Sequence, residues 1–154
     1  MVARIFTTVA AVLTVSAWAL PLAAQAKLDV RFGILVTGND GQADFVETAQ
    51  VPNAVGQTYG WIATIEPLRD PITWTEELRL PKPPLEWDVV EGPAVAVSDD
   101  RTAARTSGVV LPTETEFSSF WTITHGDPNG PYLLIVKVSD GVVAEFTFNV
   151  VTAQ

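Results

Sequence analysis

Residues 127–150 read DPNGPYLLIVKVSDGVVAEFTFNV, and this stretch decides the fold of the chain. Apolar residues occupy every second position from 132 to 138 and again from 142 to 150. This period of two is typical of β-strands with one buried face. The dipeptide Asp140-Gly141 stands between the two runs and is a strong turn signal for a β-hairpin. We therefore predict that the chain ends in an antiparallel hairpin.

Shorter runs of the same kind precede the hairpin, separated by Gly, Pro, Asn and Asp, and no helical period follows residue 26. The expected strands cover residues 30–36, 43–51, 59–65, 72–80, 87–90, 94–97 and 115–124. Residues 101–111 are only weakly patterned, and the proline-rich residues 80–84 predict a polyproline-like crossover between sheets. Short strands without helices favour an all-β fold of two packed layers.

The residues that lead into the hairpin make this prediction more specific. The run Asp127-Pro128-Asn129-Gly130-Pro131-Tyr132 places a tyrosine at the start of the penultimate strand, as in the corner of many immunoglobulin-like domains. The chain contains no cysteine, so the disulfide of antibody domains is absent. We expect an immunoglobulin-like two-layer antiparallel β-sandwich without a disulfide.

The first 26 residues have the pattern of a secretory signal peptide. Arg4 supplies a positive start, residues 5–20 are mostly apolar and uncharged, and Ala24-Gln25-Ala26 is a small-x-small cleavage site. The apolar run is short for a membrane span of about 20 residues. We expect cleavage after Ala26, export to the periplasm or the extracellular medium, and a single β-sandwich domain at residues 27–154.

The composition of the expected mature chain excludes several classes of partner. Removal of 26 of the 154 residues leaves 128, and the loss of Arg4 leaves eight Lys and Arg against 18 Asp and Glu. Binding to phosphates needs clustered basic side chains, so neither nucleic acid nor an anionic membrane surface is an expected partner.

The scarcity of reactive side chains argues against an enzyme and against a cofactor. His125 is the only histidine, and Met1, the only methionine, leaves with the signal peptide. Transition-metal, haem and iron–sulfur sites need His, Cys or Met ligands in groups, and cysteine nucleophiles need a thiol. We therefore expect a non-enzyme without a metal or cofactor.

Several dispersed motifs form one ordered set that resembles a bacterial family. They are Glu47-Thr48, Gly60-Trp61, Thr73-Trp74, Leu78-x-Leu80-Pro81, Pro84-x-x-Trp87, Trp121, Asp127-Pro128-x-Gly130-Pro131 and Phe146-x-Phe148-x-Val150. Together, over most of residues 28–151, they are similar to the domain of unknown function DUF3859. The resemblance implies a compact exported β-domain without an assigned activity, and it supplies no catalytic residues.

Four tryptophans remain after residue 26, and one differs from the others. Three alternate with apolar neighbours and are expected in the core, where Trp is usually found: Trp61, Trp74 and Trp121. Trp87 follows two prolines and lies between Glu86 and Asp88, so we expect it to be partly exposed. Trp87, Glu86 and Asp88 are our candidate contact residues for a ligand or partner.

Glu76 is an acidic residue on the apolar face of the strand expected at 72–80. Either a β-bulge shifts the register there, or Glu76 points inward with a partner. A buried ion pair with Arg79, Arg69 or Arg31 is the expected arrangement. The adjacent Glu77 points to the opposite face, so the two glutamates cannot form an acid–base pair by themselves.

Two loops and one histidine have plain structural interpretations beside functional ones. Asn39-Asp40-Gly41-x-x-Asp44 and Asp127-x-Asn129-Gly130 resemble fragments of calcium loops, but neither has the spacing of a complete site, so ordinary turns are expected. His125 stands near Asp127 and is either a pH sensor or, more commonly, a surface turn residue without a role.

These observations favour an exported, non-catalytic binding module for a protein of the cell envelope. A carbohydrate-binding module built around Trp87 is the alternative, because aromatic rings stack on sugars. A hydrolase that uses two acidic residues is the third possibility. The sequence leaves the oligomeric state open.

Overall fold

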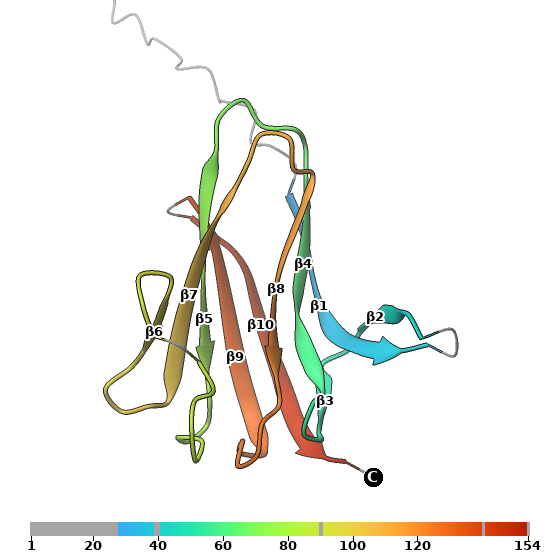
Figure 1. Cartoon of the computed structure of the whole chain (residues 1–154), viewed down its shortest axis with the longest axis vertical. Coiled ribbons are helices and arrows are strands. Elements are labelled where there is room, and N and C mark those ends of the chain that lie inside the picture. The colour runs from blue at the N-terminus through green and yellow to red at the C-terminus, as the bar shows by residue number, and fades with distance from the viewer. Residues whose placement is uncertain (1–27, 39–40, 90, 140, 154) are drawn as a thin grey trace, which may run out of the picture.

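The computed structural model describes residues 28–38, 41–89, 91–139 and 141–153, and in these ranges the chain forms two packed β-sheets (Figure 1). The predicted signal peptide, the loop residues Asn39 and Asp40, and the hairpin residue Asp140 lie outside the described residues. Within the described ranges, no helix is long and apolar enough to cross a membrane.

Ten strands make up the described part of the chain. In order they are β1 (Leu28–Thr37), β2 (Ala43–Glu47), β3 (Gln50–Asn53), β4 (Thr58–Ile65), β5 (Ile72–Arg79), β6 (Val95–Val97), β7 (Ala103–Val110), β8 (Glu116–Thr122), β9 (Gly130–Val138) and β10 (Gly141–Thr152). One sheet has the order β2-β1-β4-β8, and the other has the order β3-β10-β9-β5-β7-β6. The predicted all-β sandwich is therefore confirmed, and β9 and β10 form the predicted antiparallel hairpin.

The core lies between the sheets and is rich in aromatic rings. Trp61, Tyr132 and Phe148 are the largest fully buried side chains. The Phe148 ring joins residues of both sheets, since its centroid lies 4.5 Å from that of Phe32 and 5.4 Å from that of Tyr132. Inward-facing residues of both sheets thus interdigitate, as expected for a β-sandwich.

The run expected as one strand at residues 43–51 is divided between the two sheets. β2 pairs with β1, whereas β3 pairs in parallel with β10 and is the one parallel partner among the described strand pairs. The chain turns at Thr48, whose hydroxyl accepts a hydrogen bond from the backbone N–H of Gln50 at 3.1 Å. β3 continues through Pro52, past the expected end at residue 51, because β3 is at the sheet edge, where a missing N–H is tolerated.

The segment after β5 differs from the prediction in two ways. Residues 80–84 do not cross between sheets, because β5 and β6 belong to the same sheet. Residues 87–89 form no strand. Residues 85–87 instead form hydrogen bonds to two neighbouring turns. The backbone N–H of Leu85 donates to the carbonyl of Gly126, and the indole of Trp87 donates to the carbonyl of Arg101.

The weakly patterned residues 101–111 contain a true strand, β7. It was hard to recognise because three of its inward positions carry small or polar residues, namely Ala104, Thr106 and Gly108. Gly108 lies directly opposite Trp74, whose ring atoms would be 2.7 Å from a Cβ at this glycine. Thr106 lies opposite Glu76. The larger side chains of β5 therefore fill the space that large apolar residues of β7 would otherwise need.

The corner before β9 has the predicted tyrosine. The Tyr132 hydroxyl is buried and donates a hydrogen bond of 2.9 Å to the carbonyl of Pro128, four residues upstream. This is the geometry of a tyrosine corner in immunoglobulin-like domains. The bond fixes the loop that brings Asp127 back to the sandwich.

We expect Tyr132→Phe to lower the free energy of unfolding by about 1–3 kcal/mol, because the Pro128 carbonyl loses its donor while the ring remains packed. Tyr59→Phe is the matched control, since Tyr59 is also buried and its hydroxyl forms no hydrogen bond to any other described residue. Urea unfolding followed by tryptophan fluorescence measures both. Equal losses in the two variants would contradict a structural role for the corner hydrogen bond.

Candidate functional site

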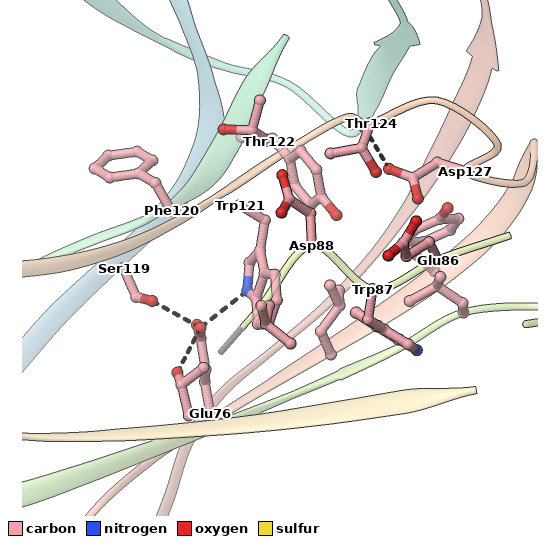
Figure 2. A pocket seen from close by; sticks show the side chains of 16 residues that line it. Glu76, Glu86, Trp87, Asp88, Ser119, Phe120, Trp121, Thr122, Thr124 and Asp127 are labelled. Carbon is pink, nitrogen blue, oxygen red and sulfur yellow. Dashed lines mark hydrogen bonds between the residues drawn. The ribbon is translucent and has the colours of Figure 1, made fainter. Parts of the chain in front are cut away.

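A cavity of about 350 Å³ lies between β8, the inner face of β5 and β7, and residues 86–89 (Figure 2). We call it the acidic pocket. Its described lining residues are Tyr59, Glu76, Leu78, Leu80, Glu86, Trp87, Asp88, Val89, Thr106, Ser119, Phe120, Trp121, Thr122, Thr124, Asp127 and Tyr132. Four of them are acidic, and none is Lys, Arg or His.

Glu76 forms the floor of the acidic pocket and is 1% exposed. Its Oε1 atom accepts hydrogen bonds from Thr106 Oγ1 at 2.9 Å, Ser119 Oγ at 2.7 Å and Trp121 Nε1 at 2.9 Å. Its Oε2 atom accepts a further hydrogen bond from Trp61 Nε1. The four donors come from β4, β7 and β8, so one carboxylate joins both sheets.

Of the two alternatives for Glu76, a β-bulge or an inward side chain, the structure shows the inward side chain. The expected ion pair with Arg79 is wrong. β5 pairs with both neighbours without a register shift, so no bulge turns Glu76 outward. Arg79 is three residues further along the strand and therefore faces the opposite side of the sheet. There its Nε atom donates to Glu77 Oε1 at 2.6 Å.

The other two expected partners of Glu76 are also elsewhere. Arg31 lies 3.4 Å from Glu47, and Arg69 is exposed and forms no ion pair within the described ranges. On the outer face, Glu77 is held by Arg105 as well as by Arg79, and these hydrogen bonds lower the pKa of Glu77. Arg79 and Arg105 thus pair with Glu77, and the donors to Glu76 are neutral.

The mouth of the pocket contains all three candidate contact residues. Trp87 is half-buried, as predicted, and its indole N–H donates to the Arg101 carbonyl at 2.9 Å. Glu86 and Asp88 flank it and are exposed. The Trp87 ring meets Trp121 edge-on, with 6.0 Å between ring centroids. The structure places the three residues in one pocket, and their role in binding stays a prediction.

Asp127 adds a fourth carboxylate that the sequence did not assign to this site. Its Oδ2 atom accepts a hydrogen bond from the backbone N–H of Thr124 at 2.8 Å. Burial raises the pKa of Asp127. Burial is also the main cause that raises the pKa of Tyr59 and Tyr132, and the charge of Asp127 raises both further.

Ser119 is a second sequence signal for this site beside Glu76. Ser119 shares the apolar face of its expected strand with Phe117 and Trp121, just as Glu76 shares the face of another strand with apolar neighbours. Two polar residues on two inward faces point to a buried hydrogen bond between the sheets. The contributions of Thr106 and Asp127 depend on strand pairing and on the corner loop, which sequence periodicity does not reveal.

The loops with calcium-like fragments act as turns where they are described. Asp127 bonds Thr124, and Asn129 Oδ1 accepts a hydrogen bond from Asn53 Nδ2 at 2.6 Å. Asn39 and Asp40 lie outside the described residues. Among the residues that are described, no group of three or more His, Cys, Asp or Glu is placed to hold a metal. His125 is exposed in the turn after β8 and does not line the pocket.

Two facing sheets, a tyrosine corner and the absence of cysteine define an immunoglobulin-like β-sandwich without a disulfide. The fold is similar to the crystal structure of an immunoglobulin-like protein from Pseudomonas aeruginosa, with a TM-score of 0.51 and 18% identity, covering 84% of this chain and 100% of that chain. A family model described as the PM0630 beta sandwich domain matches residues 30–151, and the chain belongs to this family.

The family match confirms a β-sandwich family but does not confirm the specific resemblance to DUF3859. No curated protein matches the chain. The likeness to the Pseudomonas protein concerns the fold alone, so the site must be interpreted from its own residues.

We expect Glu76→Gln to lower the free energy of unfolding by about 1–3 kcal/mol. Each carboxylate oxygen accepts a hydrogen bond from one indole N–H, so the NH2 group of glutamine must replace one of these oxygens and face an N–H that cannot accept. The matched control is Glu77→Gln, which removes the same charge at the adjacent, outward position, where ion pairs are worth about 1 kcal/mol or less. Thermal and urea unfolding measure both. An unchanged melting temperature for Glu76→Gln would show that this carboxylate does not hold the sheets together.

Asp127→Asn is expected to change stability in a pH-dependent way. Because burial raises the pKa of Asp127, ionisation in the folded state is penalised, and stability is lost as the pH rises through that pKa. The substitution should therefore stabilise slightly at neutral pH, by at most about 0.5 kcal/mol because Asp127 is about half exposed and solvent screens its charge, and should have little effect near pH 3. Unfolding curves at both pH values test this, and a loss of stability confined to neutral pH would refute it.

Proposed function

We propose that this chain is an exported, non-catalytic binding module whose partner is a protein of the cell envelope, and that the partner contacts the acidic pocket. The observation that carries the proposal is the mouth of the pocket, where Glu86, Trp87 and Asp88 lie together beside Trp121. Aromatic residues beside polar groups are common at protein-binding surfaces. Export is supported by the signal-peptide pattern of residues 1–26.

The bonding of Glu76 supports a binding role over a hydrolytic one. A general acid or base must reach the proton that it transfers. Glu76 is the one carboxylate buried among the described residues, and both of its oxygens already accept hydrogen bonds from neighbouring side chains. It therefore serves as a structural group at the floor of the pocket.

Carbohydrate binding is the second candidate, and the presence of two tryptophans with carboxylates in one pocket favours it. A sugar ring stacks on an aromatic face and donates its hydroxyl hydrogens to acidic side chains. Against it, the Trp87 and Trp121 rings meet at an interplanar angle of 67°, so they do not form one flat platform. We therefore rank a protein partner first.

Site-specific photo-crosslinking tests the proposed function. A photoreactive amino acid is placed at Asp88 in the chain, which is expressed with its own signal peptide in its source bacterium. The control probe is placed at Asp44, an exposed aspartate on β2, which is at the far edge of the four-stranded sheet from the pocket-lining strand β8. We expect a defined envelope-protein adduct from Asp88 and none from Asp44, because the partner covers the mouth of the pocket.

The other outcomes separate the candidates. A polysaccharide adduct from Asp88 would favour carbohydrate binding. The absence of any adduct from Asp88, or equal adducts from both positions, would contradict binding at this pocket. Release of the mature chain outside the cytoplasm is read from the same cells by fractionation, and a cytoplasmic, uncleaved chain would contradict export.

A further inference from the structure

We infer that the acidic pocket binds an organic cation, namely the guanidinium or ammonium group of an arginine or lysine side chain of the partner. This inference rests on the proposed function and specifies the chemistry of the group that enters the pocket. Three independent features of the pocket lead to it: the buried carboxyl group at its floor, which has only neutral donors among the described residues, the free acceptors at its mouth and its aromatic wall.

The floor of the pocket is a buried carboxylate that has no cationic partner. Buried charged groups in proteins are normally paired with an opposite charge. Glu76 receives only neutral donors, from two indoles and two hydroxyls, and forms no ion pair with any described residue. The nearby cations Arg79 and Arg105 lie on the outer face with Glu77. A positive group in the pocket would supply the missing charge.

The mouth of the pocket offers acceptors that are not in use. The carboxylates of Glu86 and Asp88 form no hydrogen bond or ion pair with other described residues. Asp127 lies further in and is partly engaged by Thr124. A guanidinium carries five N–H donors in a planar fork and an ammonium carries three, and both are suited to several carboxylate acceptors at once.

The wall of the pocket suits the rest of a long basic side chain. Trp87 and Trp121 border the cavity beside Leu78 and Leu80. Arginine and lysine have an apolar stem that packs on such surfaces, and their charged groups are attracted to aromatic faces. The volume of about 350 Å³ is at the lower end of the range of small-molecule pockets, which suits one side chain rather than a large ligand.

The same features disfavour a neutral occupant. A sugar needs donors as well as acceptors from its site. The indole N–H groups of Trp61 and Trp121 are engaged by Glu76, and that of Trp87 is engaged by a backbone carbonyl. Among the described residues, the Tyr59 hydroxyl is a donor that is not in use, whereas Glu86 and Asp88 leave several carboxylate oxygens unused, so the pocket offers mainly negative charge and acceptors.

Titration with small cationic probes tests this inference on the exported chain. The indole N–H signals of Trp87 and Trp121 are followed by NMR while N-acetyl-arginine amide or N-acetyl-lysine amide is added. N-acetyl-citrulline amide has nearly the shape of the arginine probe but no charge. We expect both cationic probes to shift the two signals, and citrulline to bind at least about tenfold more weakly.

Matched charge variants separate local from overall electrostatics. The double variant Glu86→Gln/Asp88→Asn should weaken arginine binding about fivefold or more. The control Glu145→Gln/Asp44→Asn removes the same charge from exposed sites outside the pocket and should change binding less than about twofold, because distant charges are screened. Equal binding of citrulline and arginine, equal effects of the two double variants, or unshifted indole signals would overturn the inference.

The outcomes distinguish this inference from the proposed function. A protein adduct at Asp88 combined with no response to cationic probes would leave the binding module intact and refute only the cation. A response to arginine combined with no protein adduct would keep the cation chemistry and refute the protein partner. In the latter case the cation would have to come from a small molecule.

Discussion

The carboxylate of Glu76 fixes how the two sheets are placed relative to each other. From β5 it accepts hydrogen bonds from β4 and β8 of the facing sheet, and from the neighbouring strand β7 of its own sheet. If the sheets moved apart, the donors of β4 and β8 would be left unsatisfied in the interior. Gly60 makes the approach of β8 possible, because a Cβ there would lie 2.1 Å from the Ser119 carbonyl oxygen. The wall of the acidic pocket follows directly from this arrangement.

The alternation of apolar residues and the turn residues predicted the parts of the fold that neighbouring residues determine. The alternation of residues 132–150 and the tyrosine after Gly130 were sufficient for the terminal hairpin and its corner. β7 has a weak pattern because Thr106 and Gly108 stand at inward positions, and these residues are explained only when the opposing Glu76 and Trp74 are known. The division of residues 43–51 into β2 and β3 depends on competition between two sheets for the same segment, and no local pattern carries that information.

The candidate site was predicted in composition but not in arrangement. The run from Glu86 to Asp88 predicts a partly exposed contact surface because charged residues flank a tryptophan after two prolines. The structure places all three residues at one pocket. The ion pair expected between Glu76 and Arg79 is wrong for a simple geometric reason, since residues separated by an odd number along a strand face opposite sides. The sequence shows that a buried acid needs a partner, and tertiary structure decides that indoles and hydroxyls supply it.

The parallel pairing of β3 with β10 has a consequence for the order of folding. Gln50 lies opposite Asn149, so the backbone groups of β3 that face β10 find their hydrogen-bond partners only when β10 is in place. Contacts between such distant positions require the closure of a long loop and slow the folding reaction. The sandwich therefore cannot close before β10 has been synthesised. Late closure keeps the polypeptide unfolded for longer, which is the state that the proposed export through a translocation channel requires.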